Sequence, residues 1–141
     1  MITSGFKPPY APTLIPYLTV RDAQKALDFY QHAFGFKLAN EPSRNEKGFI
    51  QHVEMQFYDA LIMFAPEGAF EGPSKAPITN KVFPSITLYL YCGDVDSLCQ
   101  QALNAGAQLI VKLNDGFWGD RFFQVTDPDG HSWSFATKLS S

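Results

Sequence analysis

The chain has 141 residues, of which 45% are hydrophobic and 18% charged, and its formal net charge is −3 at pH 7. This length suits one domain with a sizeable core and excludes a multi-domain protein. The 11 Lys and Arg residues form no cluster, which excludes the basic surface typical of nucleic-acid-binding proteins. We therefore expect a single domain over residues 1–141 whose partners are small molecules.

The N-terminal segment MITSGFKPPYAPTLIPY lacks the basic stretch and apolar run that are typical of a secretory signal. No apolar stretch approaches the ~20 residues that a membrane-spanning helix needs. We therefore expect a cytoplasmic protein without a membrane partner. Cys92 and Cys99 lack the C-x-x-C spacing of zinc and redox motifs, so we expect both to be reduced residues of the core.

The first half of the chain begins with a strand-like run at residues 14–20. Asp22 follows as a suitable cap for a helix over residues 23–34, which Gly35 is suited to end. Three further strands are expected, at residues 36–40, 49–57 and 60–64. Residues 67–83 are rich in Pro and Gly and lack periodicity, which predicts a linker over the surface.

The second half repeats this order. A strand-like run at residues 86–92 precedes Asp94, a helix expected over residues 95–105 and a helix stop at Gly106. Three strands follow, at residues 108–112, 121–126 and 132–137. The sequence DPDG at residues 127–130 predicts a tight turn between the last two strands. Each half is therefore predicted as one βαβββ module, and the chain as an internal duplication.

This duplication resembles the vicinal oxygen chelate superfamily, which includes glyoxalase, bleomycin resistance proteins and dioxygenases. The most specific match is Phe117-Trp118-Gly119-Asp120-Arg121 followed by Asp127-Pro128-Asp129-Gly130-His131, with Trp133 and Phe135 in the closing strand. This segment is similar to the resistance-type and PhnB-like branch. The resemblance covers nearly the whole chain and implies an α+β fold, with modules at residues 13–66 and 84–137 paired around a cup-shaped cleft.

Metal-dependent members of the superfamily take ligands from the first and last strand of each module. The corresponding positions in this chain are Ile15, Met63, Thr87 and Ser134. None of them offers the imidazole or carboxylate that a divalent metal of this kind needs. The resemblance therefore implies a member without a metal or cofactor, and without metal-based lyase, epimerase or dioxygenase chemistry.

Side chains alternate between the two faces of a strand, so one face of each sheet packs on a helix and the other is available to the cleft. The residues expected on the cleft face are Tyr17, Thr19, His52, Glu54, Gln56, Leu61, Met63, Thr87, Tyr89, Tyr91, Phe122, Gln124 and Ser134. Aromatic walls with a few polar groups are typical of small-molecule sites. The alternative is that these residues face solvent, as on a half-exposed antiparallel sheet.

Four residues around the loop at 116–119 are further candidates. Trp118, beside Phe117, has no obvious strand or helix to pack on, and the resemblance implies that an aromatic residue of this loop covers the ligand. The alternative is that both rings are buried in a dimer interface or under the linker. Asp120 and Arg121 can recognise a charged group of the ligand or pair with each other.

The histidines give one catalytic candidate. His52 and Glu54 project side by side from one strand, so they can act as a base and its partner or form a surface ion pair. We expect His131 to shape the hairpin after the DPDG turn and His32 to be solvated.

Our leading hypothesis is a homodimeric binding protein that sequesters a flat, largely aromatic or apolar compound, with or without a positive group, in its clefts. The alternative is a lyase or isomerase of the same superfamily that uses Glu54 and His52, or a metal bound at other positions. A third hypothesis is a structural or regulatory dimer with a vestigial cleft. The sequence leaves open whether the modules pair within one chain or between two chains.

Overall fold

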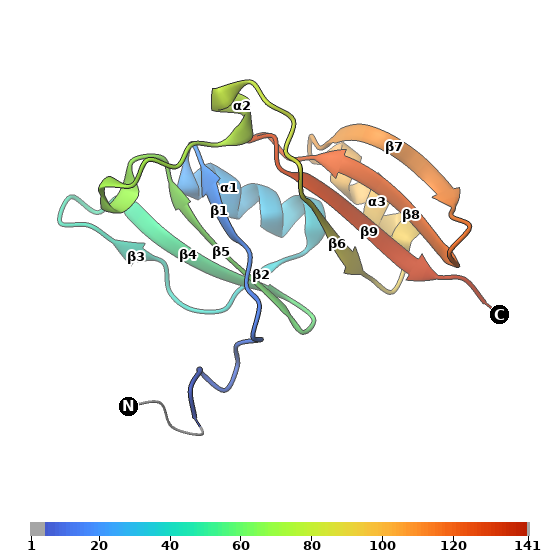
Figure 1. Cartoon of the computed structure of the whole chain (residues 1–141), viewed down its shortest axis with the longest axis horizontal. Coiled ribbons are helices and arrows are strands. Elements are labelled where there is room, and N and C mark those ends of the chain that lie inside the picture. Colours follow the sequence, from blue (N-terminus) through green and yellow to red (C-terminus); the bar gives the residue numbers. More distant parts are fainter. Residues whose placement is uncertain (1–4, 141) are drawn as a thin grey trace.

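The computed structural model describes residues 5–140, so residues 1–4 of the segment examined for a secretory signal, and residue 141, lie outside it. The described chain forms two sheets side by side (Figure 1). The first has the order β1 (Tyr17–Val20), β5 (Ala60–Pro66), β4 (Ile50–Phe57), β2 (Lys37–Leu38), with β3 (Ser43–Arg44) also paired to β4. The second has the order β6 (Thr87–Tyr91), β9 (Ser132–Lys138), β8 (Asp120–Thr126), β7 (Gln108–Asp115).

The two sheets have the same internal plan. In each, the first strand pairs in parallel with the last, and the remaining pairs are antiparallel. The connection after each first strand is the main helix of that half. This arrangement confirms the expected α+β fold with two βαβββ units.

The helix boundaries follow the predicted caps. The carboxylate of Asp22 accepts a hydrogen bond from the N–H of Lys25 at 3.0 Å at the start of α1 (Ala23–Phe29), which continues as the π-helical turn η1 (Tyr30–Phe34). Gly35, with φ of 81°, ends that helix in the left-handed conformation that glycine adopts without a steric cost. Asp94 caps α3 (Val95–Asn104) in the same way. None of the helices within residues 5–140 is long and apolar enough to cross a membrane.

The region between the modules, which was predicted as a linker over the surface, contains two short elements that the sequence did not predict. It contains a 3-10 turn, η2 (Ala69–Glu71), and a short helix, α2 (Pro77–Asn80). The carboxylate of Glu67 accepts hydrogen bonds from the Ala76 N–H and the Thr79 hydroxyl, which fastens this region to the end of β5. Elements of three or four residues are too short to show a hydrophobic period, so the sequence pattern does not detect them.

Several strands also differ from the prediction. The first begins at Tyr17 rather than residue 14, the second covers only Lys37–Leu38, and β3 was not predicted. β3 pairs only two polar residues with β4 and lacks any apolar alternation. β7 extends to Asp115 rather than ending near residue 112, because register shifts after Leu109 and Val111 allow the pairing with β8 to continue. Such bulges interrupt the alternation on which a strand prediction depends.

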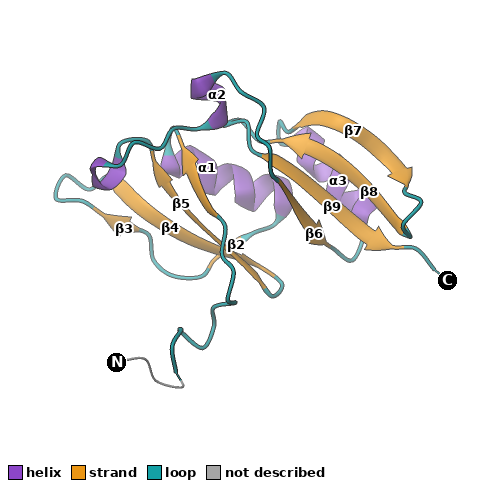
Figure 2. Cartoon of the chain, in the orientation of Figure 1, coloured by secondary structure: helices purple, strands orange, loops and turns teal. Residues whose placement is uncertain are grey.

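The helices of both modules pack against each other on one side of the two sheets (Figure 2). The ring of Phe34 on η1 lies 5.2 Å from Trp133 and 4.7 Å from Phe135, both on β9. Gln101 on α3 donates to the carbonyl of Ala33 at 3.2 Å. The two modules therefore share one hydrophobic core on the helix side, and the other face of each sheet is left open.

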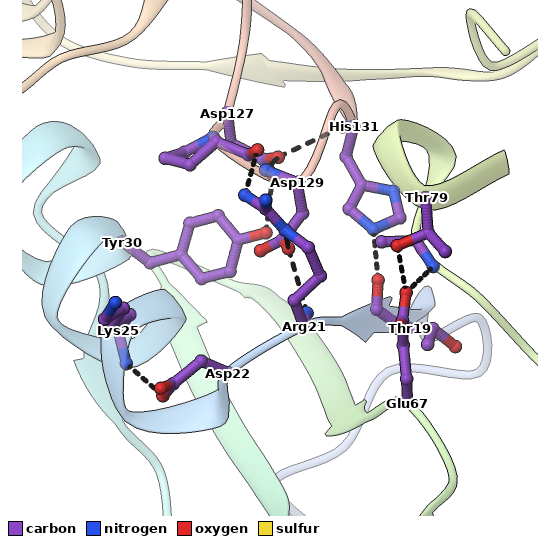
Figure 3. Close-up of polar contacts among 12 residues, drawn as sticks. Thr19, Arg21, Asp22, Lys25, Tyr30, Glu67, Thr79, Asp127, Asp129 and His131 are labelled. Atoms are coloured by element: carbon purple, nitrogen blue, oxygen red, sulfur yellow. Dashed lines mark hydrogen bonds and ion pairs between the residues drawn. The ribbon is translucent and has the colours of Figure 1, made fainter. Parts of the chain in front are cut away.

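The DPDG turn fastens the second module to the helix of the first (Figure 3). Asp127 is buried, and its Oδ2 accepts hydrogen bonds from the Tyr30 hydroxyl at 2.6 Å and the Trp133 indole N–H at 2.9 Å. Its Oδ1 accepts the backbone N–H groups of Asp129 and His131. Burial raises the pKa of Asp127, and these donors oppose that effect because they stabilise the ionised form.

Two further contacts tie the same turn to the first module. Arg21 donates through its backbone N–H and Nε to the carboxylate of Asp129, at 2.9 and 3.0 Å (Figure 3). The imidazole Nε2 of His131 lies 2.7 Å from the carbonyl oxygen of Thr19. Residues 127–131, the second part of the motif most specific to the resemblance, are therefore structural, because they hold the end of β1 beside the start of β9.

Candidate functional site

Strand pairing places the expected cleft residues on the open faces, in two separate sets. Paired residues of neighbouring strands point to the same face, and Met63 pairs with both Tyr17 and Glu54. Ser134 similarly pairs with Tyr89 and Gln124. The first set comprises Tyr17, Thr19, His52, Glu54, Gln56, Leu61 and Met63, and the second Thr87, Tyr89, Tyr91, Phe122, Gln124 and Ser134. One chain therefore presents two open half-sites, each on its own sheet.

The first half-site contains a continuous chain of hydrogen bonds. The Tyr17 hydroxyl lies 2.9 Å from Nδ1 of His52, and Nε2 of His52 lies 2.9 Å from Oε2 of Glu54. Oε1 of Glu54 accepts from the Tyr10 hydroxyl at 2.9 Å and from the Asn40 amide at 2.7 Å. These contacts, with that from His52 the strongest, hold the pKa of Glu54 below its usual range. Sequence reasoning missed both donors, because Tyr10 precedes the first predicted strand and Asn40 ends a predicted strand from which no cleft residue was expected.

The donor and acceptor roles in this chain depend on which imidazole nitrogen of His52 carries a proton. Desolvation, together with the negative charge of Glu54, raises the pKa of Tyr17, so its phenol keeps its proton. A phenol that donates to Nδ1 of His52 requires the imidazole proton on Nε2, where it is donated to the ionised Glu54. The three side chains therefore form an ordered path for a proton, with Tyr17 at its exposed end.

The second half-site is organised around Asp120. Three neutral donors reach its Oδ2: the Tyr89 hydroxyl at 2.6 Å, the Tyr91 hydroxyl at 2.8 Å and the Trp118 indole N–H at 3.2 Å. These contacts hold the pKa of Asp120 below its usual range. Burial and the bond to Asp120 raise the pKa of Tyr89 to about 12, so its phenol remains a donor. The result is an ionised carboxylate that fixes three aromatic side chains.

Trp118 packs on the second sheet, contrary to the expectation that its loop offers no packing surface. Its ring covers Gly116, where a side chain would place Cβ 2.7 Å from the indole, and lies 4.9 Å from the ring of Phe122. The indole remains 49% exposed, whereas Phe117 at the tip of the loop is 99% exposed. The structure therefore places Trp118 as a wall of the open face and leaves Phe117 free to contact another molecule.

Asp120 and Arg121 do not pair with each other, so this alternative of the sequence analysis is wrong. Arg121 lies on the helix side of β8, where its Nε is 2.7 Å from Asp96 and its Nη1 is 3.1 Å from Asp115. The contact with Asp96, followed by that with Asp115, raises the pKa of the guanidinium. Arg121 was expected in the ligand site, but the structure places it on the opposite face from Asp120, since successive residues of a strand point in opposite directions.

Polar side chains at the start of β6 and β9 contact each other. The hydroxyl of Thr87 lies 2.9 Å from that of Ser132, and the Gln124 amide donates to the same Ser132 oxygen at 2.7 Å. Ser132 was not among the expected site residues, although alternation places it on the same face as Ser134. This cluster gives the second half-site a polar edge.

The side chains at the expected metal positions do not suit a divalent metal. Ile15 precedes β1, and the strand partners of Met63 and Ser134 are Tyr17, Glu54, Tyr89 and Gln124. Glu54 is the single carboxylate in this set, which contains no imidazole. Within residues 5–140, no three or more His, Cys, Asp or Glu side chains are grouped so that they could hold a metal ion.

An apolar groove of about 730 Å³ lies beside Tyr17, between the facing edges of β1 and β6. Its apolar walls are formed mainly by Leu14, Val82, Phe83 and Ile86. This volume lies within the range of small-molecule sites, which is about 300 to 1,000 Å³. The groove therefore offers apolar surface next to the first half-site.

Comparisons with known proteins agree with this architecture. Residues 12–135 match the family described as Glyoxalase/Bleomycin resistance protein/Dioxygenase superfamily. An uncharacterized protein of Mycobacterium tuberculosis (strain ATCC 25618 / H37Rv) is 37% identical over 126 residues, which cover 87% of this chain and 72% of that protein.

Two solved structures have a similar fold. The crystal structure of TioX from Micromonospora sp. ML1 aligns with a TM-score of 0.71 and 25% identity, covering 92% of this chain and 100% of that one. TnmS3, an antibiotic binding protein from Streptomyces sp. CB03234, aligns with a TM-score of 0.60 and 21% identity, covering 91% and 98%.

Proposed function

The chain belongs to the Glyoxalase/Bleomycin resistance protein/Dioxygenase superfamily, and on that premise we propose that it is a metal-free protein that binds and sequesters a small, flat, largely aromatic or apolar molecule. The observation that carries this proposal is the aromatic wall of the second sheet, which consists of Tyr89, Tyr91 and Trp118. Rings that are already fixed lose little conformational entropy when a ligand stacks on them. TnmS3, which has a similar fold, is an antibiotic binding protein, and this supports the proposal.

We propose that two copies of the chain complete each cleft, with the first sheet of one copy facing the second sheet of the other. Each copy has used its helix side for the shared core, so the open faces are the surfaces available for pairing. They carry apolar groups that monomers seldom expose together, including Tyr17, Tyr91 and the fully exposed Phe117. In this arrangement the modules at residues 13–66 and 84–137 of one chain would each form one wall of a different cleft.

The polar groups of the half-sites further restrict the ligand. Both carry an ionised carboxylate, Glu54 on the first sheet and Asp120 on the second. Arg121, the cation nearest in sequence to Asp120, is held on the other face by two carboxylates. A phosphate or a carboxylate ligand would meet like charge at both half-sites, which disfavours it. A compound that relies on stacking and on a few contacts with Gln56 or Gln124 fits better.

Tryptophan fluorescence tests this proposal, because the two indoles have different surroundings. Trp133 is fully buried, whereas Trp118 is half exposed on the proposed wall. Titration with acridine is expected to change the emission saturably in the wild type, and Trp118→Phe should remove most of that change. Tyr58→Phe alters an exposed ring outside the half-sites and serves as the matched control. A wild-type emission that does not respond to acridine or to other flat tricyclic compounds would overturn the binding proposal.

The ordered path from Tyr17 through His52 to Glu54 favours a second candidate function, a lyase or isomerase. Reactions that move a proton between carbon and oxygen need a positioned acid or base of this kind. The test is the exchange of α-hydrogens of small hydroxyketones with deuterium from solvent, followed by NMR. Exchange that His52→Gln abolishes supports this function, and an absence of exchange supports sequestration.

A further inference from the structure

Asp120 is a shielded anion without a cationic partner in the described part of the chain. It is only 4% exposed, and none of the four ion pairs among residues 5–140 includes it. Its three hydrogen-bond donors are neutral, so they stabilise the carboxylate without cancelling its charge. A shielded charge of this kind is normally paired, because removal from water penalises it. Among the described residues, no cation therefore lies within ion-pair distance of Asp120.

Two cations lie near Asp120 in the sheet, and neither forms an ion pair with it. Lys138 is its partner on β9 and lies on the same face, but no ion pair joins their side chains. Arg121 follows Asp120 directly, but it is engaged by Asp96 on α3 and by Asp115 on β7, on the helix side of the sheet. These two carboxylates already neutralise the guanidinium, so Arg121 is held on the helix side and away from Asp120. The position beside the Asp120 carboxylate is therefore open to a cation from a bound molecule.

The side chains around Asp120 also favour a cation. The rings of Tyr89 and Tyr91 lie 5.8 Å apart at an angle of 76°, and the indole of Trp118 donates to both Tyr89 and Asp120. These three side chains are each between 42% and 59% exposed, although the carboxylate behind them is not. The faces of electron-rich rings attract cations, most strongly where water is displaced. A phenol that donates to a carboxylate becomes more electron-rich, which increases this attraction.

We propose that the second half-site binds the positively charged nitrogen of an aromatic or planar cation, with Asp120 as its counterion and Tyr89, Tyr91 and Trp118 around it. This inference rests on the proposed binding function and specifies its ligand class as compounds with an ammonium, pyridinium or acridinium nitrogen. The first half-site is compatible with such a ligand, because its carboxylate, Glu54, is also ionised.

Two probes of nearly equal shape test this proposal. N-methylacridinium carries a permanent positive charge, whereas acridine is neutral in mildly alkaline buffer. Calorimetric titration of the full-length protein is expected to give the cation at least about a tenfold lower Kd, which corresponds to about 1.4 kcal/mol. Asp120→Asn keeps the shape of the side chain and removes its charge, so the two Kd values should then agree within about twofold.

Matched variants separate charge from structure. Asp115→Asn removes one negative charge from the same β7–β8 hairpin on the opposite face, and the preference for the cation should persist. Tyr58→Phe removes the hydroxyl of an exposed tyrosine outside the half-sites, so it should also retain the preference. Should Asp120→Asn fail to fold, salt provides a second test with the wild type. Raising the KCl concentration about tenfold should weaken the binding of the cation more than the binding of acridine.

The outcomes distinguish this inference from the proposed function. Equal or tighter binding of acridine by the wild type, or an unchanged preference in Asp120→Asn, would overturn the cation site and leave the binding function standing. Failure of both probes to bind would contradict the proposed function, and with it the cation site.

Discussion

The hydroxyl of Tyr30 is predicted to be one of the most important single groups for the stability of the fold. It donates at 2.6 Å to the buried carboxylate of Asp127 and so joins the helix of the first module to the second sheet. Tyr30→Phe removes only this oxygen, because the ring stays in the same packed position. Hydrogen bonds to charged groups contribute about 1.5–3 kcal/mol, and the variant also leaves a buried carboxylate with fewer donors. We therefore expect a loss of about 2 kcal/mol, or roughly 6–8 °C in Tm for a domain of this size.

Urea unfolding followed by tryptophan fluorescence measures this loss. Trp133 is a suitable reporter because it is buried and its indole donates to the same carboxylate. Tyr58→Phe removes the hydroxyl of an exposed tyrosine and should change the free energy of unfolding by less than about 0.5 kcal/mol. A loss in Tyr30→Phe no larger than that of Tyr58→Phe would refute the structural role assigned to the DPDG turn.

The same variant has a predicted pH dependence. Burial raises the pKa of Asp127 above its value in the unfolded chain, so this group lowers stability as pH rises through the interval between the two values. The Tyr30 hydroxyl opposes that loss, because it donates more strongly to the ionised carboxylate than to the protonated one. The destabilisation by Tyr30→Phe should therefore be larger at about pH 8 than at about pH 4. An equal penalty at both values would contradict the assignment of an ionised Asp127.

Three further predictions concern the site and the assembly. Elemental analysis of protein purified without chelator should find no stoichiometric divalent metal; near one zinc, nickel, manganese or iron per chain, lost on mutation of open-face residues, would contradict this. Light scattering should give the mass of two chains, and Phe117→Asp should shift it toward one, whereas a monomeric wild type would refute the pairing of open faces. Trp118→Ala should weaken the binding of acridine by at least about tenfold; a change within twofold would assign the loop to the interface instead.

The parts of the fold that the sequence predicts are those with local causes. A side chain such as Asp22 caps a helix through a hydrogen bond three residues away, and Gly35 ends it through its own backbone conformation. The same two signals recur at Asp94 and Gly106, so both helices were predicted almost to the residue. The short elements β3 and α2 have no such signal, because they depend on contacts with β4 and Glu67.

The sequence predicts on which face of a sheet each site residue lies, but it does not predict which side chains these residues contact. Alternation along β8 places Phe122 and Gln124 on the open face, and the same rule would have placed Arg121 on the other one. The bonds from Tyr89 and Trp118 to Asp120 depend on how a loop returns to the sheet across Gly116. Nothing local in the sequence encodes that approach. Asp120 was a candidate for recognising a charged group, but its position at the centre of the aromatic wall was found only in the structure.

The most direct test of the proposed binding function uses the two indole N–H groups of the protein. A ¹⁵N–¹H spectrum should show one indole resonance for Trp118 and one for Trp133, and Trp118→Phe assigns them by removing the first. On titration with N-methylacridinium, the account predicts that the Trp118 resonance shifts saturably while that of the buried Trp133 stays in place. A titration in which neither resonance moves, or only that of Trp133, would contradict the assignment of the open aromatic wall as the ligand site.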